Sequence, residues 1–374
     1  MTNRGETGTR SGAEPDHGSE EPMAAEVTQA AEVSQAAEAT SSPNPLFRAY
    51  PQLGGRIPWV HLGDWPTPVE RVAAVPAGFR GELWVKRDDR SSRHYGGNKV
   101  RKLEYLLADA AAAGAGRLIT TGVEGSHHCL ATAVHGRRVG LPTTLVVFPQ
   151  PETEHSLEMA ALNRAWADEV RLCRSVAGQP FVEAAVRWRC RADRPYVIPG
   201  GGSNATGALG YVGAALELAE QVRAGVAPRP DVITVAAGTL GTLAGLAVGV
   251  AMTGLADRIV GVRIVPWTVG NRVVLGRLVE GVVRRLTGAG VRAPDPRLAL
   301  DRVQLVGDYL GDGYGHPTEW GDRATEWFAE RGLALDPSYT GKTVAGVLDG
   351  LAAEPDAVHL YWHTLSSVHP ASSP

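Results

Sequence analysis

Cysteine is scarce in this sequence. The 374 residues include three cysteines, at positions 129, 173 and 190, and their spacing matches no disulfide framework. We therefore expect reduced thiols and a reducing compartment. No uninterrupted apolar run is long enough to cross a bilayer, and the polar residues that open the sequence are not followed by the apolar core of a signal peptide. These absences predict a cytoplasmic protein without a membrane partner.

An excess of basic charge is also lacking. Lys and Arg together number 37 and Asp and Glu number 40, which gives a net charge of −3 and argues against broad binding to nucleic acid. Hydrophobic residues make up 44% and charged residues 21%, as in an ordinary globular protein. The length exceeds one average domain, so we expect two lobes or one large α/β unit.

Several motifs of catalysis and binding are missing. No Gly-x-Ser-x-Gly elbow is present, which leaves α/β-hydrolase chemistry without support. The tripeptide GKT at 341–343 resembles the end of a P-loop, but Asp336 stands where that motif requires its first glycine. The tripeptide HHC at 127–129 has diverging side chains and no second ligand pair at a suitable spacing. We therefore expect neither a nucleotide triphosphate nor a metal.

The composition changes near residue 45. Residues 1–45 are dominated by Ala, Glu, Ser, Thr and Gly, and we expect a disordered tail because so few large apolar side chains cannot offset chain entropy. Beyond it, strand-like and helix-like segments alternate. The predicted strands span 83–86, 118–121, 143–148, 170–172, 196–198, 232–235 and 259–264. The predicted helices span 99–113, 128–139, 156–166, 181–192, 208–223 and 243–252. This alternation predicts a parallel sheet, whose ligands bind beyond the carboxyl ends of the strands.

Lys99 is the most informative residue of the sequence. It follows Gly96, Gly97 and Asn98, where a glycine-rich loop meets a predicted helix. Glycines let the backbone pass close to a bound group, and Asn is a common N-cap. We expect the positive potential of the helix start to lower the pKa of Lys99. A partly neutral lysine can hold an aldehyde as a Schiff base and carry protons. An ordinary capped helix with a solvent-facing lysine is the alternative that this motif leaves open.

Three further glycine-rich joins are present. After the strand at 118–121, Ser126 can cap the next helix or receive a carboxylate, and the two roles are compatible. The join at 237–245 offers backbone amides and a threonine hydroxyl that suit a phosphate, or else small residues for close packing of a helix on a strand. Its spacing does not match the dinucleotide fingerprint, which disfavours NAD. The join at 200–207 is interpreted as a crossing between lobes.

A lysine at a loop–helix join, a phosphate cradle and a carboxylate site together indicate pyridoxal 5'-phosphate. That cofactor needs an aldehyde anchor, a phosphate cup and a group near its ring nitrogen. Four sequence blocks then carry a resemblance to a known family. They are VKRDD at 85–89, GGNK at 96–99, IPGGGSN at 198–204 and DPSYTGK at 336–342. From residue 62 to residue 364, the chain resembles the pyridoxal-phosphate enzymes that comprise D-cysteine desulfhydrase and 1-aminocyclopropane-1-carboxylate deaminase.

The resemblance implies an architecture. We expect an α/β protein with the two-lobed tryptophan-synthase-β-like fold, in which open, mostly parallel sheets are flanked by helices. The cofactor would lie in the cleft between the lobes. A large cofactor-binding domain would comprise residues 46–98 and 205–374, and a small domain would comprise residues 99–204. The resemblance also implies a homodimer.

The resemblance assigns roles to individual residues. Lys99 is implied as the Schiff-base lysine and Ser126 as the contact of the substrate carboxylate. Tyr314 and Tyr339 are implied to line the substrate pocket, with core packing as the alternative for both tyrosines. The implied cofactor contacts are Lys99, Asn98, His127, Gly238, Thr239, Leu240, Gly241, Thr242, Thr340 and Thr364.

Some positions distinguish branches of this family. Thr340 and Thr364 stand where the cyclopropane deaminases typically carry glutamate and leucine. A neutral threonine near the pyridine nitrogen favours simple β-elimination over ring opening. Two departures concern substrate choice. In the first, His127, whose charge depends on pH, replaces the asparagine that normally contacts the phenolic oxygen of the cofactor. In the second, Leu-Ser-Ser at 365–367 replaces a pair of glycines. Leu240 also replaces a small residue in the phosphate loop.

The leading prediction is a pyridoxal-phosphate lyase that performs α,β-elimination and deamination of a small amino acid. With D-cysteine, the products would be pyruvate, ammonia and sulfide, and Lys99 would remove the Cα proton. The first alternative is a specialised biosynthetic lyase or β-replacement synthase acting on an unusual amino acid. Deamination of 1-aminocyclopropane-1-carboxylate ranks lower, as does a non-catalytic ligand-binding descendant.

Overall fold

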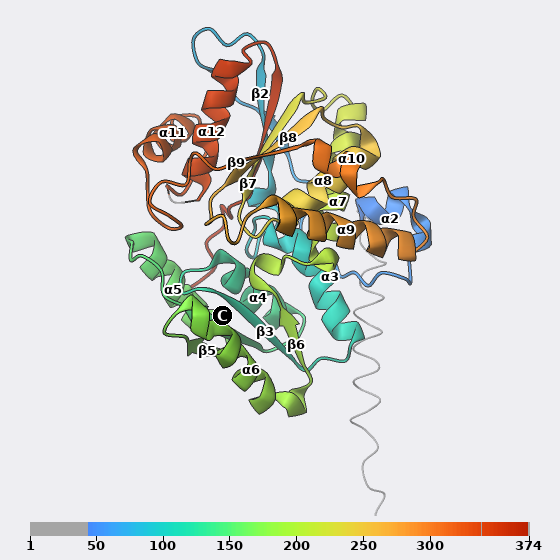
Figure 1. Ribbon diagram of the computed structural model, residues 1–374, viewed down its shortest axis with the longest axis vertical. Helices are drawn as coiled ribbons and strands as arrows, with labels where there is room; N and C mark the ends of the chain where they lie inside the picture. Colours follow the sequence, from blue (N-terminus) through green and yellow to red (C-terminus); the bar gives the residue numbers. More distant parts are fainter. Residues whose placement is uncertain (1–43, 338, 373–374) are drawn as a thin grey trace, which may run out of the picture. The chain divides into compact units, whose positions relative to one another are not determined.

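Two open sheets organise the computed structural model, which describes residues 44–337 and 339–372 (Figure 1). Of the disordered tail expected at residues 1–45, residues 1–43 lie outside the described residues. Asn44 is already buried, and its side chain caps the short helix α2 (Pro45–Ala49) by accepting a hydrogen bond from the Leu46 amide at 2.9 Å. None of the helices in the described ranges combines the length and apolar character that a bilayer crossing demands.

Sheet A has six strands in the order β1-β2-β10-β7-β8-β9. All neighbours are parallel except β1 and β2, which pair antiparallel. Every residue of β7 is buried, as expected for a parallel strand that is covered on both faces. The strands span β1 (Val69–Arg71), β2 (Glu82–Arg87), β7 (Val232–Ala237), β8 (Arg258–Arg263), β9 (Val303–Val306) and β10 (Val358–His363).

Helices cover both faces of sheet A. The apolar cluster on one face contains Leu360 and Trp362 of β10, and the cluster on the other face contains Tyr361, because side chains alternate along a strand. The first face is covered by α7 (Ala205–Arg223), α8 (Gly241–Thr253), α9 (Arg272–Gly288) and α10 (Pro296–Asp301). The second face is covered by α11 (Glu319–Ala329) and α12 (Thr340–Ala353), which Figure 1 shows on the opposite side of the strands.

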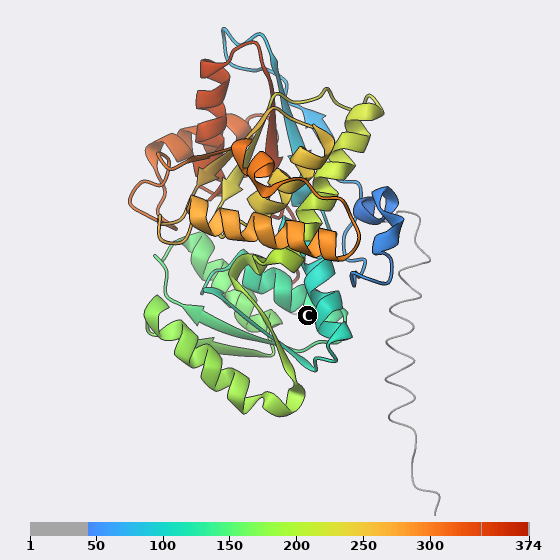
Figure 2. The same cartoon turned by 45° about the vertical axis from the view of Figure 1, so that its right-hand side comes forward.

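Sheet B is fully parallel, with four strands in the order β5-β4-β3-β6. The strands span β3 (Arg117–Val123), β4 (Thr143–Phe148), β5 (Glu169–Leu172) and β6 (Pro195–Ile198). One face packs against α3 (Lys99–Ala112), α4 (His127–Arg138) and α5 (Glu154–Trp166), and the other against α6 (Gln179–Arg189). Figure 2 shows this sheet and its helices in cyan to green, below sheet A. We propose that each sheet is the centre of one of the two domains expected from the sequence.

The sequence predictions between residues 83 and 264 are confirmed. Each of the seven strands and six helices predicted there is present, with bounds shifted by at most three residues. The short 3-10 turns were not predicted: η1 (Pro51–Leu53), η2 (Asp88–Arg90), η3 (Val176–Gly178), η4 (Arg191–Asp193) and η5 (Gly200–Gly202). The sequence also gave no separate signal for β1, β9, β10 or the helices after β8.

A buried charged network fixes the loop that leads into α3. Asp88 accepts hydrogen bonds from the Arg101 guanidinium at 2.8 and 2.9 Å, and Arg101 also reaches Glu217 of α7. Lys86 of β2 donates to Glu217 at 2.6 Å. Burial alone would raise the pKa of Glu217, but Arg101 and Lys86 outweigh it and lower that pKa to about 2. The Asp88 carbonyl accepts from the Gly97 amide at 2.9 Å, so the network anchors the glycine-rich loop.

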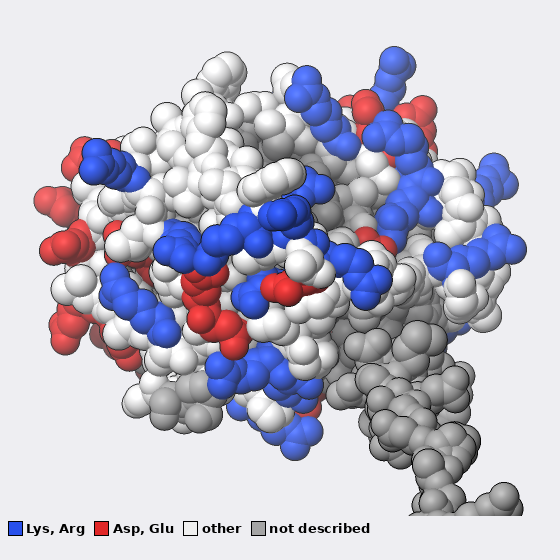
Figure 3. Space-filling model, turned by 90° about the horizontal axis from the view of Figure 1, so that it is seen from below, with Lys and Arg blue, Asp and Glu red and all other residues white. Residues whose placement is uncertain are grey.

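Charge on the surface is mixed. On the face shown in Figure 3, acidic side chains lie among the basic ones. A row of basic side chains crosses the middle of this face, with acidic side chains beside it.

Candidate active site

A cavity of about 520 Å³ receives residues from both sheets. Its walls come from the segments that follow β3, β4, β7, β8 and β10 and from the loop before α3. The expectation that the site lies beyond the carboxyl ends of parallel strands is thus met by the cavity. The predicted site residues that line it are Asn98, Lys99, Ser126, His127, Gly238, Thr239, Tyr314, Tyr339 and Thr364.

The four remaining predicted residues do not line the cavity. Leu240, Gly241 and Thr242 form the start of α8, and Thr340 is the first residue of α12. Thr340 is fully buried, and its hydroxyl donates to the Asp336 carboxylate at 2.8 Å. Any influence of Thr340 on a ligand in the cavity is therefore indirect.

Lys99 is the first residue of α3, and its amine donates to the Asn98 side-chain oxygen at 2.6 Å. Burial lowers the pKa of Lys99 to about 8. The sequence contains four lysines, and Lys99 is the one that lines the cavity. The others donate elsewhere: Lys86 to Glu217, Lys102 to the Gly201 carbonyl and Lys342 to the Leu310 carbonyl.

The expected role of Asn98 as a helix cap is wrong. Asn98 has helical backbone angles and makes no capping hydrogen bond. Its amide instead donates to the Thr242 hydroxyl at 3.1 Å, which links α3 to the start of α8. The cause expected for the pKa shift of Lys99 also changes, because burial of the amine lowers the pKa.

Gly97 is required by the close approach of two chain segments. Its φ is +85°, in the left-handed region that favours glycine. A Cβ atom there would lie 2.8 Å from the Thr364 carbonyl oxygen. The loop before Lys99 therefore packs directly on the end of β10.

Ser126 caps α4, as predicted. Its hydroxyl accepts a hydrogen bond from the Cys129 amide at 3.3 Å. Gly122 on β3 leaves room for this hydroxyl, since a Cβ at Gly122 would lie 2.6 Å from the Ser126 oxygen. Ser126 also lines the cavity, and its contact with a substrate carboxylate stays a prediction that the capping geometry allows.

The join between β7 and α8 is held by Ser203. The Ser203 hydroxyl lies 2.7 Å from the Thr239 hydroxyl and accepts from the Gly241 amide at 3.2 Å. Leu240 has φ +66°, a left-handed conformation that is uncommon for a residue with a side chain. Strained backbone of this kind persists where the surroundings fix it, often at ligand-binding loops.

Lys102 does not line the cavity but contacts residues next to it, and the sequence reasoning did not single it out. Its amine donates to the Gly201 carbonyl at 3.0 Å and to the Ser203 hydroxyl at 3.4 Å, beside the loop after β7. Burial and the neighbouring charge of Lys99 lower the pKa of Lys102 well below its usual range. A usable signal was present, because residues three apart on a helix share a face and Lys102 follows Lys99 by three.

The hydroxyl groups of the two cavity tyrosines, Tyr314 and Tyr339, keep their protons. Burial raises the pKa of Tyr339 to about 12, and the Thr364 and Asn98 side chains partly offset this shift. Burial likewise raises the pKa of Tyr314. The Thr364 hydroxyl oxygen is buried, and within the described residues no group forms a hydrogen bond of ordinary geometry with it. It is therefore available to a ligand in the cavity.

His127 has both ring nitrogens engaged by protein groups. Nδ1 lies 2.5 Å from the Tyr95 hydroxyl, and Nε2 lies 3.0 Å from Nε2 of His155. Burial, followed by the charges of His155 and Lys99, lowers the pKa of His127 to about 3. The pH-dependent charge expected for His127 is thus confined to strongly acidic solution.

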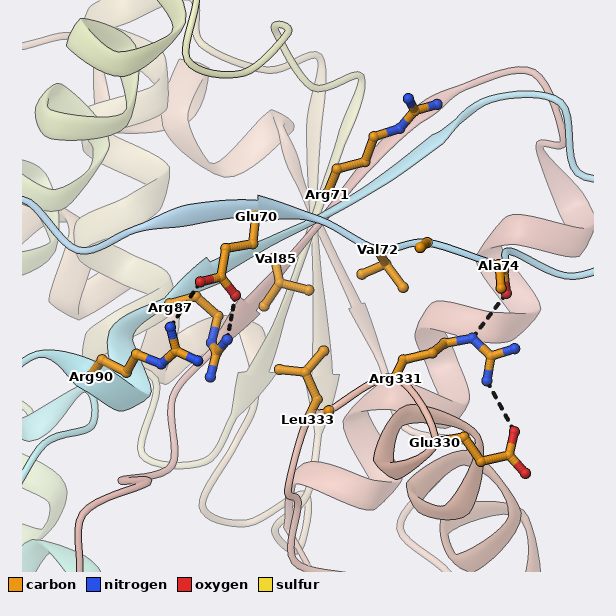
Figure 4. Close-up of a pocket in the computed structure, with 12 residues that line it drawn as sticks. Glu70, Arg71, Val72, Ala74, Val85, Arg87, Arg90, Glu330, Arg331 and Leu333 are labelled. Atoms are coloured by element: carbon orange, nitrogen blue, oxygen red, sulfur yellow. Dashed lines mark hydrogen bonds and ion pairs between the residues drawn. The ribbon is translucent and has the colours of Figure 1, made fainter.

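A second cavity, of about 470 Å³, lies beside β1 (Figure 4). None of the predicted site residues lines it. Its arginines are each paired with a carboxylate, in the ion pairs Arg71–Glu82, Arg87–Glu70, Arg90–Glu70 and Arg331–Glu330. Within the described residues no group of three or more His, Cys, Asp or Glu side chains is arranged to hold a metal ion.

Known proteins resemble this chain over most of its length. Residues 60–361 match the family model described as pyridoxal-phosphate dependent enzyme. D-cysteine desulfhydrase of Klebsiella pneumoniae (strain 342) is 37% identical over 303 residues, covering 79% of this chain and 89% of that protein. D-cysteine desulfhydrase of Serratia proteamaculans (strain 568) is 35% identical over 324 residues, covering 83% and 94%.

Solved structures agree with the fold. A crystal structure of an ACC deaminase homologue has a TM-score of 0.72 and 31% identity, covering 87% of this chain and 95% of that chain. O-ureido-L-serine synthase, at 18% identity and a TM-score of 0.56 over 80% of this chain and 89% of its own, shares the fold alone. The expected α/β fold, the cofactor and the family resemblance are confirmed by these matches. The chain belongs to the family of pyridoxal-phosphate dependent enzymes.

Proposed function

We propose that this protein is a pyridoxal-phosphate-dependent lyase that converts D-cysteine to pyruvate, ammonia and sulfide. The observation that carries the proposal is the placement of Lys99, Ser126 and Thr364 around one cavity. The chain is also 35–37% identical to proteins named D-cysteine desulfhydrase.

The residues of the cavity fit the cofactor. Lys99 is the lysine whose amine lines the cavity and can reach the aldehyde, and the Thr364 hydroxyl, which also lines the cavity, suits the ring nitrogen. The loop after β7 and the start of α8 would hold the phosphate, because helix-start amides favour an anion, and the Lys102 amine beside this loop would add a hydrogen-bond donor. When bound, the cofactor supplies an electron sink that stabilises negative charge at Cα of an amino acid.

The side chains of the protein would supply the acid–base and orienting steps. A Lys99 amine with a pKa of about 8 can act as a base toward the Cα proton near neutral pH. The Ser126 hydroxyl would orient the substrate carboxylate. Tyr314 and Tyr339 remain protonated and would bound the substrate pocket. The Thr364 hydroxyl is neutral, and a neutral group near the ring nitrogen favours elimination over cyclopropane ring opening.

A β-replacement synthase or specialised lyase on a larger amino acid is a second candidate. The cavity volume of about 520 Å³ favours it, together with the apolar residues that line the opening, among them Phe148, Val176 and Val269. Such a wall accepts a larger β-substituent than a thiol.

Visible absorption of the purified protein with added pyridoxal phosphate, followed during addition of D-cysteine, tests the proposal. We expect a bound-cofactor band that changes as pyruvate and sulfide accumulate. L-cysteine and 1-aminocyclopropane-1-carboxylate are the controls, and a thiol nucleophile added to the same assay reveals β-replacement. A cofactor band that D-cysteine leaves unchanged, with no pyruvate, contradicts D-cysteine as the substrate.

Replacing Lys102 by methionine should weaken cofactor binding. Because the pKa of Lys102 is strongly lowered, its amine would act as a neutral hydrogen-bond donor, which contributes about 0.5–1.5 kcal/mol, so we expect the Kd for pyridoxal phosphate to rise about 2- to 10-fold. Titration of the cofactor-free protein, followed by absorption, measures this. Lys102→Arg retains a hydrogen-bond donor and should show a smaller increase. An unchanged Kd in Lys102→Met would show that this amine does not contact the phosphate.

A further inference from the structure

Three side chains form a continuous hydrogen-bonded chain beside the cavity. Tyr95 lies in the loop before α3, His127 begins α4 and His155 lies in the first turn of α5. The Tyr95 hydroxyl lies 2.5 Å from His127 Nδ1, and His127 Nε2 lies 3.0 Å from His155 Nε2. The Tyr95 and His127 rings are stacked with an interplanar angle of 10°, and the two imidazole centroids are 5.1 Å apart. Three separate elements therefore hold one linear array of exchangeable protons.

The chain leads from the cavity toward the surface. Tyr95 and His127 line the cavity together with Lys99, whereas His155 does not line it and is only partly buried. Glu158 follows His155 by three residues on α5 and lies 3.9 Å from His369. The Glu158 and His369 side chains are 55% and 68% exposed. The outer end of the chain thus adjoins solvent-exposed titratable groups.

The bonding capacity of each group decides which one can reach a substrate. His127 has two ring nitrogens, and both are already hydrogen-bonded to the protein. A phenol hydroxyl can accept one hydrogen bond and still donate its own proton. Tyr95 can therefore accept from His127 and donate into the cavity, which makes its hydroxyl the inner end of the chain.

We propose that Tyr95, His127 and His155 relay a proton from the surface to the leaving group of the substrate. This inference rests on the proposed elimination reaction and assigns its general acid. In the family pattern an asparagine occupies the position of His127, and an amide does not exchange protons in this way. The relay is therefore a property of this chain's own residues.

The step balances in protons and electrons. As the Cβ–S bond breaks, its electron pair leaves with sulfur, and sulfur takes the proton of the Tyr95 hydroxyl. The Tyr95 oxygen takes the proton of His127 Nδ1, and His127 Nε2 takes the Nε2 proton of a protonated His155. His155 is left neutral and regains a proton from water. No oxidant or further reactant is needed.

The electrostatics of the cavity agree with a relay whose two inner members, Tyr95 and His127, carry no resting charge. Burial keeps the pKa of Tyr95 well above its usual range, and Glu158 adds to that shift, so the hydroxyl holds its proton. Burial, His155, Lys99 and His369 keep the pKa of His127 at about 3. Positive charge on His127 is therefore transient, and the proton moves onward rather than residing there.

Leaving-group dependence tests the proposal. Tyr95→Phe, His127→Asn and His155→Gln are compared on D-cysteine and on 3-chloro-D-alanine, whose chloride departs without a proton. General acid catalysis contributes about 10²–10⁴-fold, so we expect Tyr95→Phe to lower kcat for D-cysteine about 100-fold or more and for the chloride substrate less than about threefold. The other two variants should show the same asymmetry. Tyr309→Phe, which removes a phenol hydroxyl bonded to Asp349 outside the cavity, is the matched control. Equal losses on both substrates would overturn the relay.

A second readout does not depend on turnover. Nitrogen-15 NMR of the imidazoles in the cofactor-free protein reports which ring nitrogen carries the proton. We expect Tyr95→Phe to shift the signals of both His127 and His155, because the two rings are coupled through one hydrogen bond. An unchanged His155 signal would contradict the relay. If the unaltered protein fails to act on D-cysteine, the proposed function is wrong, and this coupling still decides whether the relay exists.

Discussion

Lys99→Ala should abolish turnover, with kcat lowered by at least about 10³-fold on any substrate of the unaltered protein. The amine of Lys99 is the one lysine amine that lines the cavity, and burial lowers its pKa to about 8. The variant loses both the anchor for the cofactor aldehyde and the base for the Cα proton. Pyruvate formation at saturating pyridoxal phosphate measures the loss.

Chemical trapping distinguishes this role from a structural one. Borohydride reduction of the cofactor-loaded protein should fix the cofactor on Lys99, and the small number of lysines makes the modified peptide easy to assign. Lys102→Met is the control, because it removes a neighbouring buried amine and should leave the attachment intact. Modification of another lysine, or turnover by Lys99→Ala within about tenfold of the unaltered protein, would contradict the assignment.

Local signals in the sequence were sufficient for the framework of the site. Short apolar and β-branched runs predicted the strands, and amphipathic stretches predicted the helices between 83 and 264, because these signals lie within each element's own residues. The glycine-rich joins that contain Lys99 and Ser126 were also predicted as site loops from a few consecutive residues. Gly97 and Leu240 show the limit of such reasoning, since one is fixed by the end of β10 and the other by the packing around Ser203.

Long-range contacts explain what was missed or misassigned. Asn98 is a good capping residue by composition, but the Thr242 hydroxyl, 144 positions away, takes its side chain. Tyr95, His127 and His155 lie 32 and 28 positions apart, so only the packing of α4 and α5 brings them into one array. Thr340 was placed beside the cofactor through its neighbour Tyr339, yet the start of α12 turns it toward Asp336. Sequence spacing predicts elements well and side-chain direction poorly.

Asp88→Ala should cause the largest loss of stability. Asp88 is fully buried and accepts hydrogen bonds from Arg101, Thr67, Tyr211 and Trp362, at 2.7–2.9 Å. Removing one partner of a buried ion pair leaves an uncompensated charge and costs about 3–5 kcal/mol. We expect the free energy of unfolding, measured by urea denaturation, to fall by about that amount.

A matched exposed pair separates burial from ion pairing itself. Asp356 also pairs with an arginine, Arg80, but both side chains are more than 60% exposed. Asp356→Ala should leave the urea midpoint unchanged, because solvent screens such a pair. Equal effects of the two substitutions would contradict the argument from burial. A folded Asp88→Ala protein should also bind pyridoxal phosphate more weakly, since the Asp88 side chain holds Arg101 of α3, the helix that begins at Lys99. The charged network beneath the loop thus couples the stability of the fold to the position of the catalytic amine.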